Sequence, residues 1–194
     1  MILKRLFPAV FVITLMACQK TGKTKQLNVS EEIAGLENIS DREKYLESIQ
    51  DSDQSWRDSK GSEIVLEYGK DSREYQQFLS KRDSIDQLNF KRIRLYLKEF
   101  GYPDADSVSG NASVAPWLVI QHMTDVEDRK EYFPYFNRAY KERNIEPNQF
   151  EMYLGRIYQF QFGEYPAWEG KYVADEKIQW LIEELHLEED EAGQ

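Results

Sequence analysis

The sequence predicts an all-α protein, a single compact multi-helix domain of about five to six helices behind a cleaved lipoprotein signal peptide. Three observations favour this fold class. Apolar residues recur at helical spacing over several long windows, and glycine- and proline-containing segments separate those windows. The alternation that is typical of strands is absent, apart from two short runs at 64–68 and 158–162.

The first residues have the layout of a secretory signal peptide. Lys4 and Arg5 precede an apolar stretch over 6–16, which is too short to span a bilayer as a helix. Residues 15–18 are Leu-Met-Ala-Cys, and this segment resembles the lipobox of bacterial lipoproteins, in which the cysteine is lipidated and becomes the first mature residue. An ordinary signal peptide that is cut nearby, with an incidental Cys18, is the alternative.

The lipobox resemblance implies a division of the chain and a location. We expect residues 1–17 to be removed and Cys18 to carry a lipid that makes the membrane its partner. The protein would then lie in the bacterial cell envelope, on the periplasmic face or at the cell surface. Residues 18–29 are expected to form a flexible tether, 30–187 the helical domain and 188–194 an acidic tail.

The composition excludes several classes of function. The formal charge is −10, and it becomes −12 once the signal segment with Lys4 and Arg5 is removed. Nucleic acid is therefore not expected as a partner, since phosphate contacts need clustered basic residues. Cys18 is the only cysteine, so the domain has no internal disulfide and depends on its core for stability. Serine hydrolase chemistry is also not indicated, because the nucleophile-elbow motif is absent.

The helices follow in order from sequence signals. The first is expected from Ser40, where Ser40 and Glu43 form a capping-box pattern, and a long second helix covers 72–100 before Gly101-Tyr102-Pro103 ends it. Residues 104–112 are expected to form a loop.

The later helices are the more apolar ones. Ser113 is expected to cap a third helix, with Pro116 in its first turn, and this helix should be buried centrally because it is apolar almost all round. A fourth helix is predicted over 125–143 with a kink at Pro134, a fifth around 150–158, and a last one from near Asp175.

Polar residues interrupt the apolar face of the first helix. Leu46 and Ile49 set a face that position 53 should continue, yet position 53 is Asp53. Gln54 flanks this carboxylate, and Arg57 lies one turn further on. A carboxylate on a buried face needs partners, because burying an unpaired charge is costly.

The second and third helices carry similar interruptions. Asp86 occupies the apolar series of the second helix, and Asn89 follows at the next turn. Gln121 and His122 end the third helix. We therefore expect these groups to meet in one polar cluster, with Arg156 as a further candidate member. The predicted binding residues are Asp53, Gln54, Arg57, Asn89, Gln121 and Arg156, and the predicted catalytic residues are His122 and Asp86.

The cluster has several interpretations. It is either a buried network that fixes how the helices cross or a pocket with titratable groups of shifted pKa. A third interpretation is that the assigned helix phase is displaced by one residue, so that some of these groups are exposed. As a general base, His122 would need Asp86, Asp53 or Asp125 to orient it. A divalent metal is conceivable on these oxygen ligands, but no ligand pair has a diagnostic spacing, so no metal or cofactor is predicted. The aromatic residues of 158–172 either cover the core or form a ligand platform.

Five short motifs in this order carry a family resemblance. They are Asp53-Gln54-x-x-Arg57, Asp86-x-x-Asn89, Gly101-Tyr102-Pro103, Trp117-Leu118-x-x-Gln121-His122 and Gly155-Arg156. Together they resemble a mostly helical bacterial domain family of unknown function, over about residues 45–165. The chain departs from the family pattern after Gly163. The resemblance implies no assigned activity.

The sequence therefore predicts a membrane-anchored cell-envelope lipoprotein whose helical domain binds a small molecule, a glycan or an envelope protein. One alternative is an envelope hydrolase that uses His122 with Asp86 or Asp53. The other is a structural envelope protein whose polar network is purely internal.

Overall fold

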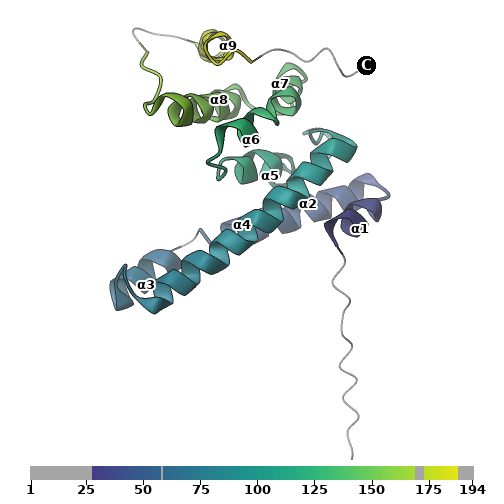
Figure 1. The fold of residues 1–194 in the computed structure, drawn as a ribbon. Coiled ribbons are helices and arrows are strands. Elements are labelled where there is room, and N and C mark those ends of the chain that lie inside the picture. Colours follow the sequence, from purple (N-terminus) through teal and green to yellow (C-terminus); the bar gives the residue numbers. More distant parts are fainter. Residues whose placement is uncertain (1–27, 58, 169–172, 188–194) are drawn as a thin grey trace, which may run out of the picture.

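A computed structural model describes residues 28–57, 59–168 and 173–187. These residues form a single all-α domain without strands, which confirms the predicted fold class. The helices are α1 (Val29–Ala34), α2 (Ile39–Gln54), α3 (Lys60–Tyr68), α4 (Arg73–Phe100), α5 (Gly110–Ile120), α6 (Val126–Lys130), α7 (Phe133–Lys141), α8 (Pro147–Phe162) and α9 (Ala174–Glu184). Figure 1 shows the long α4 crossing the molecule, with α5 to α9 gathered on one side of it.

The long helix α4 is the spine of the domain. Its 28 residues correspond to about 42 Å of helix. Ser72 caps its start by accepting a hydrogen bond from the backbone N–H of Tyr75, and Gly101 ends it with a positive φ of 73°. The prediction for 72–100 is therefore confirmed, including its termination signal.

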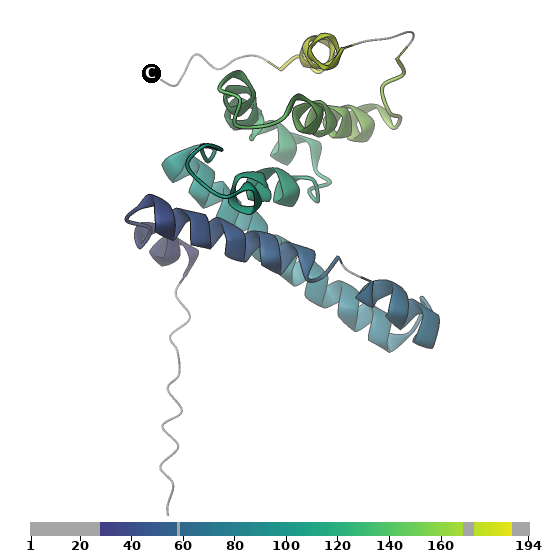
Figure 2. The same ribbon diagram turned by 180° about the vertical axis from the view of Figure 1, so that it is seen from behind.

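Helix α2 lies alongside α4, as the two views agree (Figures 1 and 2). It begins at Ile39 because the side chain of Asn38 accepts a hydrogen bond from the backbone N–H of Asp41. The predicted capping box from Ser40 was wrong. Its Glu43 instead accepts a hydrogen bond from the backbone N–H of Ser109 at 2.8 Å. The side chains that the sequence placed on the inner face of this helix are buried: Leu46, Ile49 and Asp53.

Helix α5 begins earlier than predicted. Ser109, not Ser113, is its N-cap, since the Ser109 hydroxyl accepts from the backbone N–H of Ala112 while it donates to Glu47 of α2. Pro116 therefore lies inside the helix and not in its first turn. The prediction of a central buried helix is confirmed, because α5 forms the most extensive helix–helix contact of the described residues, with α2.

The predicted helix over 125–143 is two helices. Asp125 caps the short α6, and α7 begins at Phe133 with Pro134 in its first turn, so no helix continues across the proline to be kinked. A proline is tolerated in a first turn because the N–H that it lacks has no intrahelical partner there. Next along the chain, α8 begins at Pro147, three residues before the predicted start of the fifth helix around 150–158.

Two short helices were not predicted. The first, α1, starts at Asn28 with a capping box to Glu31 and buries Val29 and Ile33, so the predicted tether over 18–29 is too long at its end. The rest of that tether and Cys18 lie outside the described residues. The second, α3, packs on the first turns of α4 and contains the short alternating run at 64–68, which is therefore helical. The run at 158–162 is also helical.

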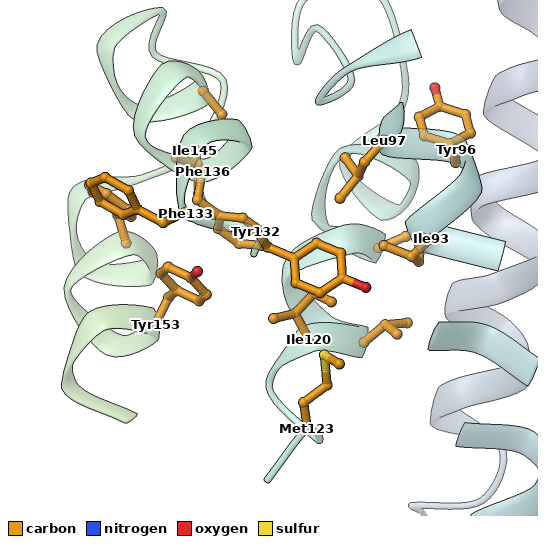
Figure 3. Close-up of a cluster of buried hydrophobic side chains, with 14 of the residues drawn as sticks. Ile93, Tyr96, Leu97, Ile120, Met123, Tyr132, Phe133, Phe136, Ile145 and Tyr153 are labelled. Atoms are coloured by element: carbon orange, nitrogen blue, oxygen red, sulfur yellow. The ribbon is translucent and has the colours of Figure 1, made fainter. Parts of the chain in front are cut away.

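The core is an aromatic layer between α4 and the later helices. Figure 3 shows Tyr132 and Ile120 between the α4 residues Ile93 and Leu97 and a group of rings that includes Phe136 and Tyr153. The rings of Phe136 and Tyr153 stack with a centroid separation of 4.4 Å. Such large buried faces contribute most of the hydrophobic stabilisation.

Candidate functional site

The predicted polar cluster forms where α2, α4 and α5 meet. Arg57, just beyond the end of α2, joins two carboxylates. Its Nη1 lies 3.3 Å from Oδ1 of Asp53, and its Nη2 donates a hydrogen bond to Oδ1 of Asp86 at 2.8 Å. Asp53 is only 1% exposed, so its charge depends on this guanidinium for compensation. The sequence was correct in placing these three side chains together.

The second oxygen of Asp53 faces α5. Gln54 donates a hydrogen bond to this Oδ2 at 2.8 Å, and Nε2 of His122 lies 3.5 Å from it. The His122 distance is an ion-pair contact when the ring is protonated and is long for a hydrogen bond. His122 therefore has Asp53 as its nearest carboxylate partner. Asp86 pairs with Arg57, and Asp125 caps α6.

Two buried amides beside this network have no hydrogen-bond partner for their side chains. Asn89 is fully buried one turn after Asp86 on α4, and Gln121 is 6% exposed next to His122. Neither the oxygen nor the nitrogen of either amide is hydrogen-bonded within the described residues. This is unusual, because most buried polar side-chain atoms in proteins are paired.

One side of the network opens to a cleft. A cavity of about 550 Å³ lies between α4 and the segment that joins α5 to α6. The side chain of Asp86 is 15% exposed and that of His122 is 27% exposed, and both line it. The complete lining is Arg82, Asp83, Asp86, Gln87, Phe90, Lys91, Arg94, His122, Met123, Thr124, Asp125, Asp128 and Tyr132.

The two walls of this cleft differ in charge. The α4 wall contributes three cations, Arg82, Lys91 and Arg94, together with two carboxylates, Asp83 and Asp86, so it carries an excess of one positive charge. The opposite wall contributes Asp125 and Asp128 from α6 and its N-cap. The cleft therefore offers positive and negative groups across a space of ligand size, with Asp86 and His122 at the edge of the buried network.

Arg129 is a buried residue that the sequence analysis missed. It is completely buried, and it donates hydrogen bonds to the backbone oxygens of Met123 at 2.7 Å and Gln121 at 2.8 Å. It therefore fixes the backbone on either side of His122. Burial, together with a smaller effect of the nearby charge of Arg156, lowers the pKa of Arg129 to about 10. No sequence signal separates Arg129 from its charged neighbours in 125–131.

Arg156 lies apart from the cluster. Its guanidinium lies 5.8 Å from the ring centroid of Phe160, and the residue lines a second cavity beside α8 and α9. Within the described ranges, no group of three or more histidine, cysteine, aspartate or glutamate side chains is arranged to hold a metal ion. The described helices also include none with the length and apolar character needed to cross a membrane.

Comparisons with protein-family models, with curated proteins and with solved structures find no match for this chain. The family resemblance of the five motifs therefore stays a prediction, and the function is argued from the site alone.

Proposed function

We propose that this chain is a lipid-anchored protein of the bacterial cell envelope whose helical domain binds a small polar ligand in the cleft between α4 and the α5–α6 segment. The ligand carries both a positive and a negative group. The anchor rests on the lipobox-like segment that ends at Cys18. The binding role rests on the geometry of the cleft.

One observation carries the binding role: the buried ionic network has an open edge. Asp53 is almost completely buried, whereas Asp86 and His122, which contact its network, line the cleft. Burying charged groups in this way lowers the stability of the fold, and proteins keep such destabilising arrangements where function requires them.

The unpaired amides argue against a purely structural network. A network that served only to fix the helices would satisfy its own donors and acceptors, as buried networks in stable cores do. The side chains of Asn89 and Gln121 are unsatisfied instead. These two amides therefore leave hydrogen-bonding groups beside the network that a purely structural role does not use.

The charges of the cleft walls favour a ligand with two opposite charges. Lys91 and Asp128 line the cleft from opposite walls, and neither forms an ion pair within the described part of the chain. The charge of Asp128 also acts on Arg94 of the α4 wall. A free amino acid or a dipeptide has groups that complement both. Such complementary charges provide orientation and specificity.

Calorimetric titration of the full chain with a panel of amino acids and dipeptides tests this proposal. We expect saturable binding of at least one member, and we expect Lys91→Gln to weaken that binding by about tenfold, the effect of losing one charge-assisted contact. Lys98→Gln is the matched control, because Lys98 is an exposed lysine on the same helix that does not line the cleft. The proposal is contradicted if no member of the panel binds, or if Lys91→Gln and Lys98→Gln change the affinity equally.

A second candidate, hydrolysis, is favoured by the contact between His122 and Asp53. If Nε2 carries the proton toward Asp53, Nδ1 keeps its lone pair and can accept a proton from water as that water attacks a carbonyl carbon. The proton then passes to the leaving group. Release of a chromogenic alcohol from a panel of esters tests this role. Activity that falls at least a hundredfold in His122→Ala and in Asp53→Asn supports it, in line with the usual contribution of a general base. Activity that is unchanged in His122→Ala eliminates it.

A further inference from the structure

A second cavity lies on the opposite side of the domain core from α2, beside α8 and α9. Figure 1 shows these two helices next to each other at the end of the chain. The cavity has a volume of about 590 Å³, within the range of small-molecule sites. Its lining residues are Asn148, Glu151, Met152, Gly155, Arg156, Tyr165, Pro166, Trp168 and Leu181.

An aromatic wall of this cavity is held in place by α9. The ring of Trp168 meets the ring of Trp180 edge-on at a centroid separation of 5.0 Å, and Nζ of Lys177 lies 5.3 Å from the Trp168 ring. Lys177 also forms an ion pair with Glu151 of α8 at 3.2 Å. The indole is therefore fixed to both helices, while the neighbouring Tyr165 is 59% exposed.

Gly155 keeps the floor of the cavity open. It lies in the middle of α8, where glycine lowers helix stability relative to alanine. No close packing requires it, because a Cβ built at this position would meet no atom within 4 Å. The same position lines the cavity. A glycine that packing does not require is explained by a ligand that approaches the helix backbone.

Arg156 is a cation in this cavity without an anionic partner. Lys177 and Glu151 compensate each other, but Arg156 forms no ion pair within the described ranges. Its guanidinium lies 5.8 Å from the ring centroid of Phe160, and the guanidinium of the buried Arg129 lies 5.3 Å from the same centroid. Two guanidinium groups therefore lie close to one ring.

We propose that this cavity binds a saccharide that carries a carboxylate. The C–H faces of a sugar ring pack on aromatic side chains, as the indole of Trp168 and the ring of Tyr165 permit. The amide of Asn148 and the carboxylate of Glu151 are suited to ring hydroxyls. Arg156 binds the ligand carboxylate, since a guanidinium matches that group in a bidentate manner. This site is independent of the cleft at Asp86 and His122.

Calorimetric titration of the full chain with trigalacturonate and with its methyl ester tests the proposal. The ester keeps the rings and linkages of the acid and removes its charge. We expect saturable binding of the acid and binding of the ester that is at least about tenfold weaker, with a loss of similar size for the acid in Arg156→Gln. Trp168→Ala should abolish binding, whereas Trp56→Ala, which removes a tryptophan from the α2–α3 segment, should leave it unchanged.

Gly155→Ala separates a binding role from a structural one. This variant fills part of the cavity without a clash, so it should fold and bind the acid more weakly than the original chain. Lys91→Gln, in the other cleft, should have no effect on this binding. The absence of saturable binding of trigalacturonate, equal binding of acid and ester, or unchanged binding in Arg156→Gln overturns the proposal.

Discussion

The carboxylate of Asp53 and the imidazole of His122 face each other at 3.5 Å across the contact between α2 and the end of α5. Asp53 is supplied by the inner face of α2, so its position follows from the burial of Leu46 and Ile49 on that face. His122 is held by the hydrogen bonds that Arg129 donates on both sides of it. The contact between Asp53 and His122 therefore connects the inner face of α2 to a turn whose backbone is held by Arg129.

Asp53→Asn should destabilise the domain by about 2 kcal/mol or more, because it breaks the buried ion pair with Arg57 and leaves that guanidinium with Asp86 as its remaining anion. Chemical denaturation of the full chain measures this loss. Asp51→Asn, an exposed position on the same helix, should change the unfolding free energy by less than about 0.5 kcal/mol. Equal stabilities of the two variants would show that the Asp53 charge is not part of the folded-state network.

Arg129→Lys should destabilise by about 2 kcal/mol or more. A lysine keeps the positive charge but lacks the planar fork that reaches the carbonyls of Met123 and Gln121, and unsatisfied buried carbonyls are costly. Arg138→Lys is the control, since Arg138 is exposed and pairs only with Glu142. The denaturation midpoints of Arg129→Lys and Arg138→Lys, each compared with the original chain, measure the difference. A tolerated lysine at position 129 would mean that water or another donor satisfies these carbonyls.

The sequence predicted the phase of α2 and α4 well because their apolar repeats are long. Leu46 and Ile49 fixed the inner face of α2, and the gap in that face correctly marked Asp53 as a buried group. The pairing of Arg57 with Asp53 and Asp86 followed from the cost of burying charge. Ion-pair partners that are distant in sequence were therefore predictable where a buried carboxylate needs a cation to compensate its charge.

The remaining differences have tertiary causes. Glu43 binds the start of α5 instead of capping its own helix, and no local pattern contains that information. Arg129 is buried because it donates hydrogen bonds to the backbone carbonyls of Gln121 and Met123 just after α5, and only the folded chain brings α6 to them. Arg156 was predicted as a further candidate member of the cluster, and α8 places it at the other cavity.

Alkaline pH should destabilise the domain above about pH 10, the ordinary pKa of tyrosine. Burial raises the pKa of six tyrosines, to about 12 for Tyr96, Tyr132 and Tyr140, and it raises those of Tyr45, Tyr102 and Tyr153 as well. Above pH 10 the unfolded chain loses these protons while the folded chain keeps them, so stability falls as the pH rises.

The lowered pKa of Arg129 has the opposite effect, since above pH 10 the unfolded chain keeps a proton that the folded chain loses, which raises stability with pH. Because one arginine opposes six tyrosines, the net result is a loss of stability. Urea midpoints measured from pH 8 to 12 should decline above about pH 10, and Tyr96→Phe should make the decline less steep. Midpoints that stay constant through this range would contradict the burial of the tyrosine hydroxyls.

Gly155→Ala should raise the unfolding free energy by about 0.5–1 kcal/mol, since alanine is the better helix former and its methyl group meets no atom. Gly61→Ala provides the contrast, because a Cβ there would lie 2.9 Å from the ring of Phe78 and must displace it. Thermal unfolding of both variants is the measurement. A stabilising Gly61→Ala together with a destabilising Gly155→Ala would contradict the described surroundings of both helices.

Cys18→Ser should release the protein from the membrane fraction. Thioether attachment of lipid requires the thiol, and the formal charge of −10 disfavours binding of the unanchored chain to anionic lipids. Fractionation of expressing bacteria, followed by a high-salt wash, measures this directly. Lys20→Ser is the control, because it changes the adjoining segment and keeps Cys18. An unaltered chain found in the soluble fraction would favour an ordinary signal peptide, and a Cys18→Ser chain that resists the wash would require a different anchor.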